Sequence, residues 1–149
     1  MITSVFVYGT LQRKQCRGNL WPRKPLDITP GYVRGQLYDL GPYPAIRCDD
    51  EDLDTDWVAG EVWSFIEDDM APTMAKLDQI EETNQPGGLN LYDRCLVRVY
   101  RSPDSPDSVL ALAYQYSTAA ALTDAQRMRS GQGSYVAWPS SDRSRRGST

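Results

Sequence analysis

The chain has 149 residues, a formal net charge of −4 and a sequence pI near 4.8. This acidic balance disfavours a nucleic-acid partner, because phosphate binding requires a concentrated basic face. The length suits one domain with one core, and no apolar run is long enough to span a bilayer, so we expect no membrane insertion.

The first predicted element is a strand over residues 2–8, which is apolar at nearly every position and should therefore be central in a sheet. Gly9 and Thr10 follow it and indicate a tight turn. Because glycine has no Cβ, the main chain can approach a ligand closely at this point. The amides of Gly9, Thr10 and Leu11 can then converge on an anionic group, such as the carboxylate of an amino acid.

The next segments alternate between loop and strand patterns. Residues 12–24 are polar and basic, which predicts a loop with one helical turn, and residues 25–30 show no periodicity. Residues 31–40 alternate and predict a strand with one solvated face. Tyr43 then lies in a proline-flanked turn before a short strand over residues 45–48, and turns of this kind commonly carry function.

The middle of the chain contains an acidic segment, a strand and the main helix. Residues 49–56 hold six carboxylates and predict a solvated hairpin tip, since Thr55 stands where a calcium-binding loop needs glycine. A strand pattern covers residues 57–66. Residues 71–82 predict a helix with Pro72 in its first turn. The Pro- and Gly-containing residues that follow, 83–90, predict a loop able to gate a pocket.

Two alternating segments, residues 92–101 and 109–116, predict a β-hairpin. Residues 119–129 predict a short helix, and residues 131–138 an irregular piece that packs through two aromatic side chains, Tyr135 and Trp138. Several strands with one strong helix predict an α+β fold, built as a small mixed β-barrel or strongly curled sheet with one main helix across one end.

We expect one domain over residues 1–138 and a disordered tail over residues 139–149, because the tail is rich in serine and arginine and lacks apolar residues that could form a core. Residues 1–11 lack the pattern of a secretory signal, so the expected location is the cytoplasm. The sequence leaves the choice between a monomer and a homodimer open.

The chain contains no histidine, which excludes Ser-His-Asp and Cys-His hydrolase chemistry and the commonest zinc-ligand sets. Its cysteines, Cys16, Cys48 and Cys95, are widely spaced and odd in number. This favours reduced, partly buried thiols over a disulfide framework or a metal site. Acid–base chemistry must therefore fall to carboxylates, tyrosines, lysines or thiols.

Glu81 is the strongest catalytic candidate. It lies at the C-terminal end of the predicted helix, beside Leu77 and Ile80, where burial and the negative end of the helix dipole would raise the pKa of its carboxyl group. A raised pKa makes a glutamate an effective base near neutral pH. Taken from the residues alone, a solvated glutamate at a helix end is the alternative.

The order of these motifs resembles the γ-glutamylcyclotransferase-like superfamily, which includes the γ-glutamylamine cyclotransferases. The most specific motifs are the Tyr-Gly-Thr-Leu turn at residues 8–11 and the Leu-Asp-x-x-Glu pattern at residues 77–81. Glu82 stands where the family usually has glycine or another small residue. The resemblance runs from about Val5 to Tyr116 and includes three further segments, Gly35–Ala45, Val58–Trp63 and Tyr92–Arg94.

The resemblance implies a cyclotransferase that uses neither a metal nor an organic cofactor. In this reaction the α-amine of a γ-glutamyl group attacks its own side-chain carbonyl, which releases 5-oxoproline and the amine attached at the γ position. Glu81 would be the general acid/base. The implied substrate-binding residues are those of the turn, with three tyrosines: Tyr8, Gly9, Thr10, Leu11, Tyr43 and Tyr116.

The expected roles differ among these residues. The turn amides would hold the α-carboxylate or the developing oxyanion. Tyr8 or Tyr116 would orient the amine through its hydroxyl group, or would serve only as a core aromatic residue. Arg94 is expected to pair with an internal carboxylate such as Asp78.

Two other functions stay open at this point. One is a non-catalytic domain that binds a small carboxylate or γ-glutamyl ligand, and the other is a different carboxylate-based hydrolase or lyase. All three readings have a small molecule as the partner, and the sequence does not specify the leaving amine.

Overall fold

The computed structural model describes residues 2–41, 43–48, 56–81, 92–117, 122–129 and 135–139. In chain order the elements are β1 (Ser4–Val7), β2 (Asp27–Asp39), β3 (Pro44–Cys48), β4 (Asp56–Ser64), α1 (Glu67–Ile80), β5 (Tyr92–Tyr100), β6 (Ser108–Tyr116), a 3₁₀-turn (Asp124–Gln126) and β7 (Arg127–Met128). No helix among these residues is long and apolar enough to cross a membrane.

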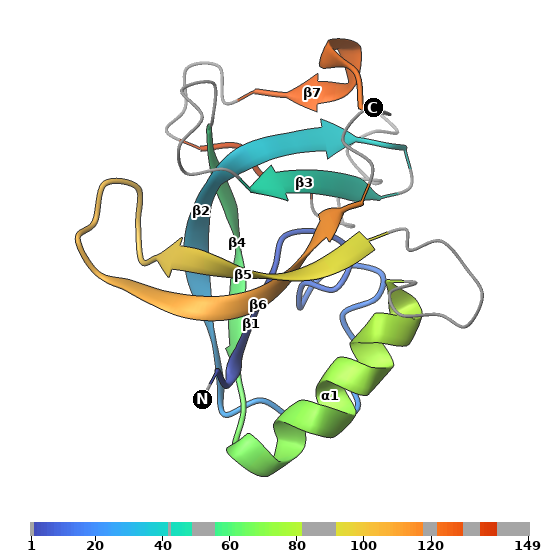
Figure 1. Cartoon of the computed structure of the whole chain (residues 1–149), viewed down its shortest axis with the longest axis vertical. Coiled ribbons are helices and arrows are strands. Elements are labelled where there is room, and N and C mark those ends of the chain that lie inside the picture. The colour runs from blue at the N-terminus through green and yellow to red at the C-terminus, as the bar shows by residue number, and fades with distance from the viewer. Residues whose placement is uncertain are drawn as a thin grey trace.

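Five strands close into a barrel in the order β2-β4-β1-β6-β5, and a pairing between Tyr32 and Tyr100 joins β5 back to β2. The strand pair β1–β6 is parallel, and the other pairs are antiparallel. β3 and β7 extend the sheet by pairing with the second half of β2. The helix α1 lies across one end of the barrel (Figure 1). The predicted α+β barrel with one main helix is confirmed.

The central strand β1 is apolar on both sides because both of its faces are covered. Phe6 packs inside the barrel with Val33 and Leu37. The neighbouring Val5 and Val7 belong to a second cluster that contains Met74 and Leu77 of α1, along with other apolar residues. Since successive side chains of a strand point to opposite faces, this arrangement explains the uninterrupted apolar run.

Two elements begin four residues earlier than the sequence predicts. β2 begins at Asp27 instead of residue 31, because its first residues pair with β4 through the backbone and need no alternating pattern. α1 begins at Glu67 instead of residue 71, with three acidic side chains in its first turn. Negative charge is favourable at a helix N-terminus, and Pro72 consequently lies inside the helix, beyond the first turn.

The C-terminal prediction of a helix over residues 119–129 is wrong for the part that the structure describes. Residues 124–128 form the 3₁₀-turn and β7, because residues 127 and 128 pair with β2. In the next segment Val136 is buried, and its N–H and C=O groups bond to β4. Tyr135 is exposed but packs edge-on against Tyr32, with ring centroids 5.4 Å apart, and Trp138 is half-buried. Cys16 is exposed, whereas Cys48 and Cys95 are partly buried, and all three are free thiols.

Some predictions lie outside the described residues. They concern the acidic tip over residues 49–55, the loop over residues 83–90, Glu82, and all of the tail beyond Pro139.

Candidate functional site

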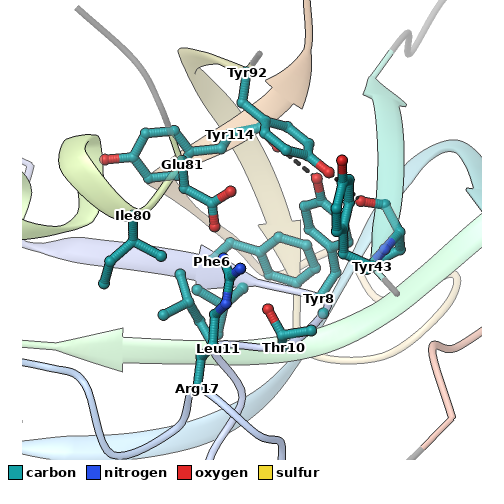
Figure 2. A pocket seen from close by; sticks show the side chains of 13 residues that line it. Phe6, Tyr8, Thr10, Leu11, Arg17, Tyr43, Ile80, Glu81, Tyr92 and Tyr114 are labelled. Atoms are coloured by element: carbon teal, nitrogen blue, oxygen red, sulfur yellow. Dashed lines mark hydrogen bonds between the residues drawn. The ribbon is translucent and has the colours of Figure 1, made fainter. Parts of the chain in front are cut away.

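One cavity lies where the end of β1 meets the end of α1. It has a volume of about 540 Å³, including its solvent-filled mouth. Figure 2 shows side chains from β1, the following loop, α1, β5 and β6 converging on it. The lining residues are Phe6, Val7, Tyr8, Gly9, Thr10, Leu11, Arg17, Tyr43, Pro44, Ile80, Glu81, Tyr92 and Tyr114.

The floor of the cavity includes the turn that follows β1. This turn is held by two backbone hydrogen bonds, from the Gln12 N–H to the Gly9 carbonyl at 3.1 Å and from the Arg17 N–H to the Thr10 carbonyl at 2.8 Å. The N–H groups of Gly9, Thr10 and Leu11 have no hydrogen-bond acceptor among the described residues. All three residues line the cavity, so their N–H groups are available to an anionic group bound there, as in anion-binding turns.

Gly9 is required by close packing on Pro44. A Cβ at this position would lie 2.6 Å from Pro44 Cγ and 2.9 Å from Pro44 Cδ, and Cβ atoms in proteins essentially never come this close to another residue. The backbone of Gly9 has no positive φ, so the reason is steric and not conformational. The sequence prediction assigned the close approach to a ligand; in the structure the close neighbour is the first residue of β3.

Glu81 directly follows the last residue of α1, and its N–H group donates to the Leu77 carbonyl at 2.8 Å. Its carboxylate is directed into the cavity, on the side opposite Thr10 and Leu11 (Figure 2). The helix end is fixed because Leu77 is fully buried in the core between α1 and the barrel. Glu81 is half-buried and lines the cavity, unlike a fully solvated glutamate at a helix end.

Asp78, three residues before Glu81, ties this end of α1 to the β5–β6 hairpin. Its carboxylate accepts a hydrogen bond of 2.6 Å from the Tyr114 hydroxyl group and forms an ion pair of 3.2 Å with Arg94. The predicted pairing of Arg94 with Asp78 is confirmed. These contacts hold the last turn of the helix, and with it Glu81, against the cavity.

Three tyrosines of the cavity are buried and donate their hydroxyl protons to fixed acceptors. Tyr8 donates to the Tyr114 carbonyl at 2.7 Å, and Tyr92 donates to the Pro44 carbonyl at 2.5 Å. Burial, together with nearby phenol groups and Glu81, raises the pKa of Tyr8 and Tyr92 well above the ordinary value. Burial and the bond to Asp78 do the same for the pKa of Tyr114. These hydroxyl groups are therefore protonated near neutral pH.

The structure brings most of the predicted site residues together. Tyr8, Gly9, Thr10, Leu11, Tyr43 and Glu81 all line the cavity. Tyr116 does not line it; its ring packs edge-on against Tyr92, with centroids 5.7 Å apart, and its carbonyl accepts a hydrogen bond from Arg47. The tyrosine of β6 that reaches the cavity is Tyr114.

Three lining residues with polar side chains, Arg17, Tyr92 and Tyr114, are not among the predicted site residues. The two tyrosines lie on predicted strands, and Tyr114 shares a strand face with the predicted Tyr116, so strand periodicity indicates the face but not which residue reaches the cavity. Arg17 lies in a loop without periodicity and had no sequence signal. No group of three acidic or cysteine side chains among the described residues is placed to hold a metal ion.

Solved structures with the same fold confirm the architecture. A YkqA structure from Bacillus subtilis superposes with a TM-score of 0.59 at 23% identity and covers 89% of this chain, which spans only 40% of that protein. An AIG2-like protein from Mus musculus superposes with a TM-score of 0.55 at 21% identity, covering 91% of this chain and 95% of its own length. At these identities the likeness shows the fold alone.

Comparison with curated protein sequences gives no match. Residues 5–137 match the family model described as "Gamma-glutamyl cyclotransferase, AIG2-like", and this range includes every residue that lines the cavity. The chain therefore belongs to the γ-glutamyl cyclotransferase, AIG2-like family.

Proposed function

We propose that this protein is a γ-glutamyl cyclotransferase that releases 5-oxoproline from a γ-glutamyl amine or γ-glutamyl amino acid without a cofactor. The observation that supports this proposal best is the shared cavity, in which the Glu81 carboxylate lies opposite the turn of Gly9, Thr10 and Leu11. Family membership supports the same class of reaction.

The proposed reaction needs one base and one set of hydrogen-bond donors. Glu81 takes a proton from the α-ammonium group of the substrate, and the freed amine attacks the γ-carbonyl carbon. The negative charge that develops on the carbonyl oxygen is stabilised by main-chain N–H groups of the turn. The bond from that carbon to the leaving nitrogen then breaks as Glu81 returns the proton to this nitrogen. The ring nitrogen gives its second proton to Glu81, which passes it to the released amine, so that 5-oxoproline and the protonated amine are the products.

The cavity suits an intramolecular reaction. Because the nucleophile and the electrophile belong to one molecule, the protein has only to fold the γ-glutamyl chain into a reactive conformation and to move a proton. Phe6, Ile80 and Leu11 give the cavity apolar walls that can hold the methylene groups of the chain. The buried tyrosines, which stay protonated, serve as fixed hydrogen-bonding groups and leave Glu81 as the acid–base residue.

The proposal is tested by replacing Glu81 with glutamine. We expect the release of 5-oxoproline from a mixed γ-glutamyl library, followed by mass spectrometry, to fall by about 10²- to 10⁴-fold, the usual contribution of a general acid/base. Glu67→Gln is the matched control, since it changes an exposed glutamate at the other end of the same helix. Unfolding curves of both variants should resemble that of the wild type.

Other outcomes would identify a different function. Calorimetric binding of γ-glutamyl compounds by the wild type without any turnover would indicate a binding domain. Release of free glutamate in place of 5-oxoproline would indicate a hydrolase. Unchanged turnover by the Glu81→Gln variant would remove Glu81 from the mechanism.

A further inference from the structure

We propose that Arg17 binds the α-carboxylate of the γ-glutamyl group, so that the main-chain amides of the turn are left to bind the γ-carbonyl oxygen. This inference rests on the proposed function, because it concerns the binding of the same γ-glutamyl substrate. Neither the family motifs nor the sequence patterns indicated a role for Arg17.

Arg17 reaches the cavity from the loop after β1. Its backbone N–H group is fixed by the bond to the Thr10 carbonyl, and its side chain lines the cavity. Figure 2 shows the guanidinium group pointing into the cavity, toward the side on which Glu81 lies. The positive charge of Arg17 acts on the cavity wall, since it lowers the pKa of Tyr92, which burial and Glu81 raise.

The guanidinium group of Arg17 forms no hydrogen bond or ion pair with any residue that the structure describes. Nearby arginines differ in this respect: Arg13 pairs with Glu61 at 3.4 Å, Arg23 with Asp69 at 3.4 Å and Arg94 with Asp78 at 3.2 Å. Arg17 is half-buried, its guanidinium group is directed into a cavity, and it has no partner among the described residues. Such a group is suited to bind an anionic ligand, and its planar donors match a carboxylate in two-point geometry.

Arg17 and Glu81 together match the charges of an α-amino acid. The α-ammonium and the α-carboxylate of a γ-glutamyl compound are carried by the same carbon atom, and the cavity offers an acid and a guanidinium on neighbouring parts of its wall. With the α-carboxylate on Arg17, the α-amine is directed to Glu81. The uncharged N–H donors of the turn then bind the neutral γ-carbonyl oxygen. There they stabilise the negative charge that develops on this oxygen in the transition state.

The test is a binding experiment that needs no turnover. Calorimetry measures the affinity of 5-oxoproline and of its carboxamide, which lacks the negative charge, for the wild type, for Arg17→Gln and for Arg13→Gln. We expect the wild type and Arg13→Gln to prefer 5-oxoproline by about ten- to hundredfold, as for a hydrogen-bonded charge pair. In Arg17→Gln the preference should fall to about twofold or less, while the affinity for the carboxamide changes little.

The substitution should leave the turn intact, because the bond to Thr10 uses the Arg17 backbone and not its side chain. An equal loss of affinity for both ligands in Arg17→Gln would overturn the proposal, as would a wild type that fails to prefer 5-oxoproline or does not bind it.

The failure of the proposed function can be distinguished from the failure of this inference. If the wild type shows the Arg17-dependent preference but no turnover, the assignment of Arg17 is supported and the enzyme proposal fails. The second case requires turnover to be measured with γ-glutamyl amino acids and with γ-glutamyl alkylamines, whose leaving amines lack a carboxylate. If Arg17→Gln lowers turnover only for the γ-glutamyl amino acids, then Arg17 binds the leaving group and the inference is wrong.

Discussion

Replacing Gly9 with alanine should damage the protein through a steric conflict with Pro44. The added Cβ would lie 2.6 Å from Pro44 Cγ, whereas ordinary van der Waals contact begins at 3.4 Å. The turn or the start of β3 must therefore move by about 0.8 Å. Neither part is free to do so, because Pro44 is the first residue of β3 and its carbonyl accepts the hydrogen bond from the Tyr92 hydroxyl group.

Overpacking of this kind costs about 1–3 kcal/mol. Urea unfolding measures this loss, and the midpoint should fall by about 1 M for a slope of 1–3 kcal/mol per molar urea. Turnover should also fall, because the three N–H donors move with the turn. In the double variant with Pro44→Ala the clashing ring atoms are absent, so the effect of Gly9→Ala on stability should be much smaller in that background.

Unfolding of Gly9→Ala at the same urea concentration as the wild type would contradict a steric conflict with Pro44. An equally large loss with and without the proline ring would contradict it as well. The first result would show that the turn and β3 are not in contact, and the second that the cost comes from the backbone of residue 9 and not from packing.

Two further predictions concern the tyrosines around the cavity. Tyr114→Phe removes the hydrogen bond to the Asp78 carboxylate, and urea unfolding should show a free energy of unfolding lower by about 1.5–3 kcal/mol. An unchanged value would show that the ion pair with Arg94 alone holds Asp78 in place. The raised pKa values of Tyr8, Tyr92 and Tyr114 favour the protonated form in the folded state, so the unfolded chain loses these protons first as the pH rises past 10. Their contribution to the free energy of unfolding is complete below pH 10 and declines above it, by up to about 1.4 kcal/mol per pH unit for each tyrosine. Urea unfolding between pH 9 and 11.5 measures this decline, and phenolate absorbance follows the ionisation directly. Ionisation of all the tyrosines near pH 10 in a protein that stays folded would contradict this.

The local patterns of the sequence predicted the elements of the site well. The apolar run ending at Gly9 predicted β1 and its turn, and the apolar spacing before Glu81 predicted a helix that ends there. Such signals are reliable because strand and helix periodicity, and turn residues, act on neighbouring positions of the chain. The start of α1 was predicted four residues late, since Pro72 was taken as a first-turn residue although the acidic side chains at residues 67–69 mark the true beginning.

The composition of the cavity could not be predicted in the same way. Tyr114 and Tyr116 are two positions apart on β6, so their side chains lie on the same face of the strand. Which of the two reaches the cavity depends on how far along β1 and α1 each lies, and strand periodicity carries no information on that. Arg17 reaches it through a loop whose path depends on the bond to Thr10.

By itself, then, the sequence determined that a glycine turn closes the first strand, that a glutamate ends the helix, and that no histidine is available for the chemistry. Only the tertiary structure decided that these two chain segments, about seventy residues apart, meet across one cavity, and that Arg17, Tyr92 and Tyr114 join them there. The physical reason is that periodicity and turn chemistry are properties of consecutive residues, whereas a cavity is formed by strand register and helix packing between distant ones.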